Sequence, residues 1–138
     1  MDKKNCICIA MKTLQKEQSI ISGQHMEFQF VCMSTTTDTI PFMLFMKNNQ
    51  KPLKAFTQCI VTPFFRLEKL DEETCCAELS LLEAIDMDGN PINSFDDDMY
   101  SLRKTKSCIT VDLNCFCAIN PLPPNLVNRP LLVIEPKY

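Results

Sequence analysis

The sequence predicts a mainly β fold: a single antiparallel, β-sandwich-like domain preceded by a short N-terminal helix. Apolar residues follow a helical spacing in residues 5–21. From residue 26 they recur in short runs separated by turn-forming residues roughly every 8–12 positions, which is typical of an antiparallel sandwich or barrel. The length of 138 residues is normal for one domain. We therefore expect an N-terminal helical segment at 1–23 and a cysteine-rich β domain at 24–138.

The first expected element is an amphipathic helix over residues 5–21. The positions that lie three or four residues apart on one face are Ile7, Met11, Leu14 and Gln18. Gly23 follows as a plausible helix end. The apolar stripe is modest, so we expect this helix to need a partner surface.

The later runs predict seven or eight short strands. In chain order these expected strands are 27–33, 39–46, 53–61, 64–70, 74–85, 100–105, 107–118 and 131–134. Polar segments at 34–38, 48–49, 71–73 and 88–90 are the expected connections. Alternation in 74–85 places Cys75, Ala77, Leu79 and Leu81 on one face. Pro121 ends the last long run, because proline donates no ladder hydrogen bond.

The composition argues against nucleic-acid and membrane partners. The net charge is −3 with a pI near 5.1, whereas binding to phosphate backbones requires clustered Lys and Arg. The densest basic runs, Lys3–Lys4 and Arg103–Lys104–Lys106, are short and typical of solvated faces. No stretch reaches the ~20 apolar residues of a membrane span. The first ten residues lack the apolar core of a secretory signal, so we expect synthesis in the cytoplasm.

Cysteine is the compositional outlier. There are nine, and an odd number indicates a free thiol or pairing between chains. Cytosolic thiols normally stay reduced, so this content conflicts with the missing signal. A protein made inside a cell and exposed to an oxidising exterior after lysis would resolve the conflict. The alternative is that many of the thiols are small buried hydrophobes.

The strand pattern divides these cysteines into two groups. Cys75, Cys115 and Cys117 fall on apolar faces, so we expect them to be buried or paired within the chain. Cys115 and Cys117 are two apart on one strand and should not bond each other. The candidates for bonds between subunits lie on polar faces or near the N-terminus: Cys6, Cys8, Cys76 and Cys108.

No catalytic, cofactor-binding or metal-binding residue is predicted. The thiol spacings are Cys-Cys and Cys-x-Cys, which do not match the Cys-x₂₋₄-Cys knuckles of structural zinc sites. The single histidine, His25, is remote from them in sequence, so no Cys–His nucleophile is indicated. Asp86–Asn90 resembles a calcium loop only superficially, and a hairpin turn is the better interpretation.

Several segments resemble the spore coat protein family that contains CotY, CotZ and ExsY. These are DTIPF at 38–42, FFRLEKL at 64–70, CCAELSLLEAID at 75–86 and, most specifically, LRKTKSCITVDLNCFCAINPLPPNLVNR at 102–129. The resemblance implies a structural, non-enzymatic protein of the endospore outer coat or exosporium. Family members self-assemble into sheets that become disulfide-crosslinked, so the implied partners are the protein itself and other coat proteins. The implied origin is the mother-cell cytoplasm, followed by exposure after lysis.

The chain also departs from this family. The family segment Cys-Pro-Thr-Gly-Cys is replaced by SGQHMEFQFVCMS at 22–34, FGNVG is replaced by FTQCIV at 56–61, and a family cysteine is Pro121 here. The histidine-rich tail has no counterpart. Fewer cross-linking points indicate an accessory or anchoring member. Two other hypotheses stay open: a small thiol-rich zinc-binding domain, and a non-polymerising adaptor that docks a partner through its N-terminal helix.

Overall fold

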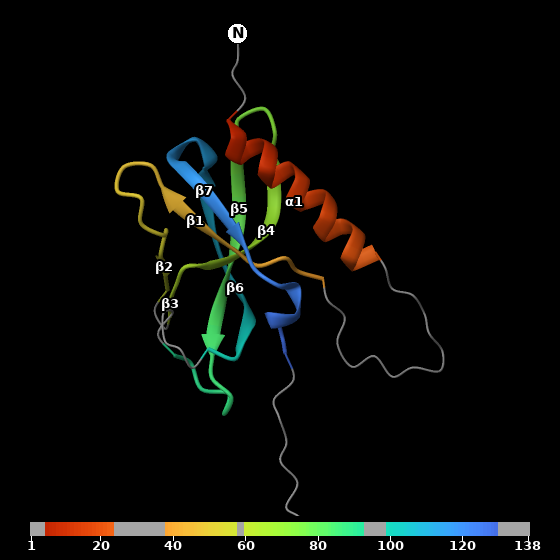
Figure 1. The fold of residues 1–138 in the computed structure, drawn as a ribbon, viewed down its shortest axis with the longest axis vertical. Coiled ribbons are helices and arrows are strands. Elements are labelled where there is room, and N and C mark those ends of the chain that lie inside the picture. Colours follow the sequence, from red (N-terminus) through yellow and green to blue (C-terminus); the bar gives the residue numbers. More distant parts are fainter. Residues whose placement is uncertain (1–4, 24–37, 58–59, 93–98, 130–138) are drawn as a thin grey trace, which may run out of the picture.

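A computed structural model describes residues 5–23, 38–57, 60–92 and 99–129. Its elements are α1 (Cys6–Gly23), β1 (Phe42–Met46), β2 (Ala55–Phe56), β3 (Val61–Thr62), β4 (Phe64–Asp71), β5 (Cys76–Ile85), β6 (Ser101–Asp112), β7 (Phe116–Pro121) and the 3-10 turns η1 (Leu113–Cys115) and η2 (Pro124–Leu126) (Figure 1). The strands expected at 27–33 and 131–134 lie outside the described residues, and so do Cys32 and Cys59. No helix in the described part of the chain combines the length and apolarity needed to cross a membrane.

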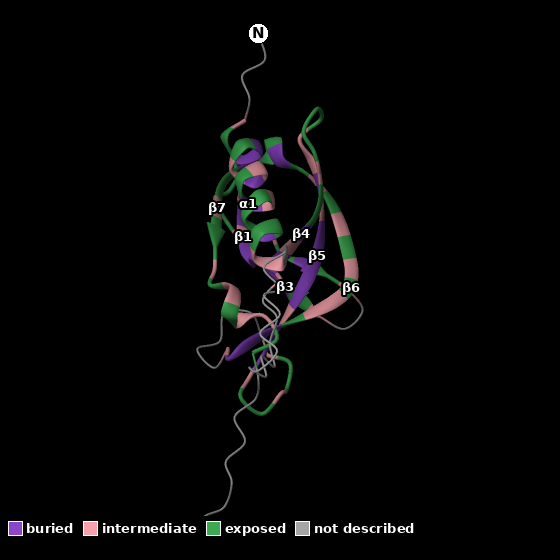
Figure 2. Cartoon of the chain, turned by 90° about the vertical axis from the view of Figure 1, so that its right-hand side faces the viewer, coloured by how far each residue is buried: buried purple, intermediate pink, exposed green. Residues whose placement is uncertain are grey.

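The main sheet has five antiparallel strands in the order β6-β5-β4-β1-β7. It is divided into two limbs, the β1–β7 limb and the β4–β5–β6 limb. Between them the register of β1 and β4 contains one pair, Phe42 opposite Phe65, with ring centroids 6.4 Å apart. Away from this pair the limbs splay, and α1 lies in the space between them (Figure 2).

Helix α1 closes the main core. Asn5 caps it, since its side-chain oxygen accepts the backbone N–H of Ile7 at 3.0 Å. The expected stripe is confirmed: Ile7, Met11, Leu14 and Gln18 are all buried. The apolar members contact buried residues from both limbs, which include Phe42, Leu44, Phe65, Leu67, Leu79, Leu81, Leu113 and Phe116. The helix and the strands therefore share one core.

The mainly β class, the antiparallel strand pairing and the N-terminal helix are confirmed. The packing differs from that of two large stacked sheets. Among the described residues the second sheet consists only of the short pair β2–β3. The place facing the main sheet is taken by α1, because its apolar stripe fills the space between the limbs.

The prediction of two strands at 100–105 and 107–118 was wrong. A single strand, β6, covers Ser101–Asp112, and η1 separates it from β7. The carboxylate of Asp112 accepts the backbone N–H of Asn114 at 2.9 Å, which caps the turn. Leu113 is fully buried there. The turn interrupts the alternation between Val111 and Cys117, so the two lie on different strands.

The expected inward face of β5 is confirmed for Ala77, Leu79 and Leu81, which are all buried. Beyond Leu81, Leu82 and Ala84 on the opposite side of the sheet are also buried, because a second apolar cluster lies there. Its buried members are Phe64, Leu82, Ala84 and Leu102. The turn predicted around Asp88 is present, with Gly89 at φ 86°.

Gln18 is the one buried polar side chain of α1 in the described region. Its Nε2 donates to the backbone oxygen of Leu67 at 2.9 Å, and its Oε1 accepts the backbone N–H of Ile40 at 3.0 Å. Both polar ends of the amide are satisfied, so burial carries no unpaired-group penalty. The residue connects the helix to β4 and to the segment that leads into β1.

A network of charged side chains lies on the outer side of the β4–β5–β6 limb. Lys104 pairs with Asp38, and Arg66 donates to Glu68 at 2.7 Å and to Thr39 at 2.8 Å. Partial burial raises the pKa of the Asp38 carboxyl, but hydrogen bonds from Lys104 and Thr39 outweigh this and lower the pKa overall. The pKa of Glu68 is lowered in the same way, by hydrogen bonds from Ser80 and Arg66 against partial burial.

This network predicts an acid-dependent loss of stability. A carboxyl whose pKa is lowered by folding stabilises the native state above its unfolded pKa and loses that contribution as the pH falls through the folded value. We expect the urea midpoint to be flat above about pH 5 and to fall below about pH 4. Lys104→Gln should lower the midpoint near pH 7 and have progressively less effect as the pH falls to about 2. Lys106→Gln, at an exposed position on the same strand, should have little effect at either pH. An equal effect of Lys104→Gln at both pH values would contradict the assignment.

Candidate cross-linking surface

The described cysteines concentrate at one end of the molecule. The start of α1, the turn between β4 and β5, and η1 meet at the top of Figure 1. On or beside these segments lie Cys6, Cys8, Cys75, Cys76, Cys115 and Cys117. Cys108 is the exception among the described thiols, since it lies four residues before the end of β6.

Cys8 and Cys75 form a disulfide within the chain, with their Cα atoms 5.7 Å apart. This corrects the expectation that Cys8 bonds a neighbouring subunit, and it agrees with the intramolecular expectation for Cys75. Cys8 lies on the buried face of the first turn of α1. Sequence position suggested an accessible N-terminus, whereas the helix turns this side chain into the core.

Hydrogen bonds to the backbone of Leu113 bring the two halves of this disulfide together. Asn5 Nδ2 donates to the backbone oxygen of Leu113 at 2.7 Å, which ties the helix start to η1. The backbone N–H of Leu113 in turn donates to the oxygen of Cys75 at 2.9 Å. Cys75 itself has φ 57°, a left-handed conformation unusual for a residue with a Cβ. This turn geometry points the Cys75 side chain to α1 and leaves Cys76 to begin β5.

Cys76 is a free, half-exposed thiol among carboxylates. Its Cα partners are Asp71 on β4 and Asp112 on β6, and Glu78 follows on the same face. The adjoining turn adds exposed Glu72 and Glu73. The polar-face position predicted for Cys76 is therefore the one observed.

Cys108 is also free and exposed, as its predicted polar-face position requires. Partial burial raises the pKa of this thiol, and the charges of Glu78 and Glu68 raise it further. The thiolate is the reactive form, so a raised pKa makes Cys108 a slow participant in disulfide chemistry near neutral pH.

Cys115 and Cys117 were expected to be buried or paired within the chain, and neither expectation was right. Both are free and exposed. Because η1 rotates the chain after Asp112, the buried positions become Leu113 and Phe116. Cys115 is joined to the turn after β1 through the Lys47 N–H, which donates to its backbone oxygen at 2.9 Å. The Cys117 Sγ lies 3.7 Å from the Met46 oxygen.

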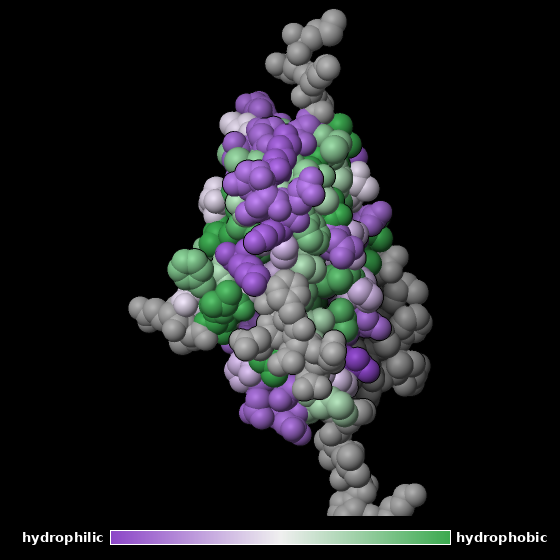
Figure 3. Space-filling view, turned by 60° about the vertical axis from the view of Figure 1, so that its left-hand side comes forward, coloured by the Kyte–Doolittle hydropathy of each residue, from purple (hydrophilic) through white to green (hydrophobic). Residues whose placement is uncertain are grey.

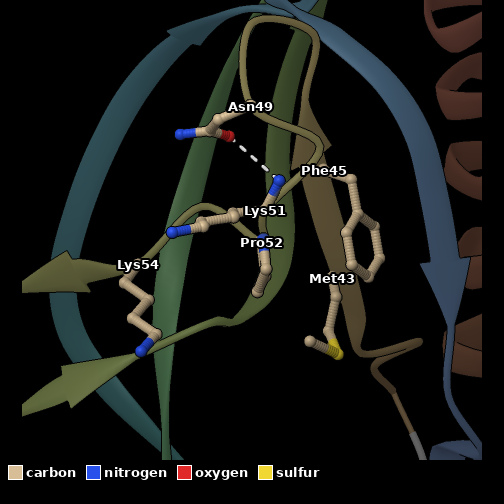
Figure 4. A pocket seen from close by; sticks show the side chains of 6 residues that line it. All are labelled: Met43, Phe45, Asn49, Lys51, Pro52 and Lys54. Carbon is tan, nitrogen blue, oxygen red and sulfur yellow. Dashed lines mark hydrogen bonds between the residues drawn. The ribbon is translucent and has the colours of Figure 1, made fainter.

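The turn after β1 is basic and borders an open hollow of about 480 Å³. Met43, Phe45 and Pro52 provide apolar walls, and Lys51 and Lys54 extend along its edge (Figure 4). The Asn49 side-chain oxygen accepts the backbone N–H of Lys51 at 2.9 Å, which holds the turn closed. Figure 3 brings this side of the molecule forward and shows hydrophilic residues running over its upper part.

The remaining predicted site residue, Cys6, is free and exposed on the first turn of α1. Within the described ranges no three His, Cys, Asp or Glu side chains group in a way that would hold a metal ion. Sequence reasoning missed the acidic surroundings of Cys76, since Asp71 and Asp112 are 41 positions apart and meet only through the register of β4, β5 and β6. The absence of Asp and Glu between residues 39 and 67 was the signal that could have identified the basic turn.

Comparisons with known proteins found one matching family and a curated relative. The family described as spore coat protein Z matches residues 1–124. A curated protein named spore coat protein Z, from Bacillus subtilis (strain 168), is 36% identical, over 94% of this chain and 97% of that protein. No solved structure matches the chain.

Proposed function

The chain belongs to the spore coat protein Z family, and from this we propose that it is a structural, non-enzymatic protein of the spore outer coat or exosporium that self-associates and is then cross-linked by disulfides. Its partners are further copies of itself and other coat proteins. Its place of synthesis is the mother-cell cytoplasm. The departures from the family pattern at 22–34, 56–61 and Pro121 support an accessory or anchoring role within the layer.

The observation that carries this proposal is the division of the described thiols into one internal bond and a free set. Cys8–Cys75 is satisfied within the chain, while the free thiols are exposed or half-exposed: Cys6, Cys76, Cys108, Cys115 and Cys117. Soluble proteins seldom expose so many thiols, because exposed thiols oxidise and link chains together. Such a set suits a protein whose function is to be linked.

Mass measurement in two redox states tests this proposal. Protein purified with reductant and then oxidised should form species with a mass several-fold that of the monomer by size exclusion with light scattering. On gels, their covalent bands should disappear when reductant is added. Serine replacement of the five free, described cysteines together with Cys32 and Cys59 should remove the covalent bands and keep Cys8–Cys75. A discrete monomer in both redox states would refute self-association. Thiol titration that changes on adding a chelator would instead favour the zinc-binding alternative.

A further inference from the structure

The carboxylates around Cys76 form a surface with excess negative charge. This surface, the acidic end, consists of Asp71, Glu72, Glu73, Glu78 and Asp112. The Lys12 Nζ lies 3.3 Å from the Glu72 Oε1 and offsets the charge of that carboxylate. Lys69 is the cross-strand partner of Glu78. Two lysines against five carboxylates leave the acidic end net negative.

The opposite charge gathers on the other limb. This surface, the basic turn, consists of Lys47 and Lys51, both exposed, at and after the end of β1. No Asp or Glu occurs between residues 39 and 67 to neutralise it from the same segment. Lys51 and Lys54 also line the open hollow, whose apolar walls can bury part of an incoming turn.

Free thiols lie beside both charged surfaces. Cys76 sits within the acidic end, between Asp71 and Asp112 in the register. Cys115 and Cys117 sit beside the basic turn, joined to it through the Lys47 and Met46 backbone contacts. The acidic end and the basic turn therefore have opposite charges, and each has a free thiol beside it.

We propose that the acidic end of one copy docks on the basic turn of a second copy, and that Cys76 of the first then forms a disulfide with Cys115 or Cys117 of the second. This inference rests on the proposed function and specifies its contact. In the covalent step the two thiols lose two protons and two electrons, one S–S bond forms, and dioxygen takes up the protons and electrons to give hydrogen peroxide.

The two surfaces lie on different limbs, and the contact between them is heterologous, because its two sides differ. A heterologous contact builds rings or extended arrays when each copy uses both of its surfaces. Exposed charge pairs contribute little to stability, so the charges mainly orient the encounter and the disulfide makes it permanent.

Mixing two complementary cysteine variants tests the pairing. Both keep the full chain and the Cys8–Cys75 bond, and both carry serine at the remaining positions Cys6, Cys32, Cys59 and Cys108. The first variant adds Cys76→Ser, and the second adds Cys115→Ser and Cys117→Ser. We expect neither to form covalent dimers alone in air, and their mixture to form a 1:1 dimer that reductant dissolves.

Charge reversal supplies an independent test. Lys47→Glu with Lys51→Glu, or Glu73→Lys with Glu78→Lys, should each slow the covalent dimerisation of the otherwise native chain about tenfold. Mixing the two reversed chains should restore the rate, because each offers a surface complementary to the other. Asp71 and Asp112 are left unchanged, since both accept backbone N–H groups.

The outcomes separate the contact from the proposed function. If the native chain assembles but the mixed cysteine variants form no dimer, or if one of them dimerises alone, the contact is wrong and self-association stands. Unaltered rates in both charge-reversed chains would also overturn the contact. If the native chain stays monomeric in both redox states, the proposed function itself fails.

Discussion

Replacing Phe42 with alanine is expected to lower the free energy of unfolding by about 3–5 kcal/mol. Phe42 is fully buried and, opposite Phe65, forms the one pair in the register between β1 and β4. The truncation leaves a cavity where the two limbs meet and removes packing contacts from the core that α1 shares with the strands. Small domains are stable by about 5–15 kcal/mol, so this loss approaches the whole margin. Urea denaturation followed by far-ultraviolet circular dichroism measures it.

Phe56→Ala is the matched control, because it removes the same atoms from a side chain that is 76% exposed. We expect it to change the unfolding free energy by less than about 0.5 kcal/mol. Similar losses for the two substitutions would mean that Phe42 does not hold the limbs together. A fully unfolded Phe42→Ala chain would agree with the prediction, and Phe42→Leu, which keeps most of the volume, should then recover a folded protein.

Loss of the Cys8–Cys75 bond is the second large expected effect. The bond closes a loop with a sequence separation of 67. Restricting the unfolded chain to such a loop stabilises the native state by about 4 kcal/mol in the chain-entropy description. We therefore expect the free energy of unfolding of Cys8→Ala to be about 4 kcal/mol lower than that of the oxidised native chain. Urea denaturation of the isolated monomer measures the difference.

Redox state separates the bond from the packing of the Cys8 side chain. With reductant present, the native chain and Cys8→Ala should differ by less than about 1 kcal/mol, because cysteine packs as a small hydrophobe. Cys76→Ser changes the adjacent, half-exposed residue, which is outside the bond, and should leave oxidised stability unchanged. An oxidised native chain that is no more stable than its reduced form would contradict the prediction.

Local patterns in the sequence predicted much of the fold. The 3–4 spacing of Ile7, Met11 and Leu14 placed the helix and its buried face, and the alternation of Ala77, Leu79 and Leu81 placed β5 and its core side. Both depend on the periodicity of a single element, which neighbouring residues alone determine. The break at η1 was missed because Leu113, Cys115 and Cys117 continue the apolar alternation of the sequence through the turn.

The candidate site was predicted less completely. Cys6, Cys76 and Cys108 are free and accessible as their positions suggested, whereas Cys8 is bonded internally and Cys115 and Cys117 are exposed. Each of these errors has a cause outside the local pattern. Cys8 faces inward because α1 lies between the limbs, and Cys115 and Cys117 face outward because η1 rotates the chain.

The sequence alone determined the secondary-structure class, the family and the identity of the thiols, since these depend on composition, periodicity and motif. The tertiary structure decided which thiols pair and which charges surround the free ones. Cys8 meets Cys75 across 67 positions, and Asp71 meets Asp112 only through the strand between them. Distances between remote segments are set by how helix and limbs pack around their shared core, and no local pattern encodes them.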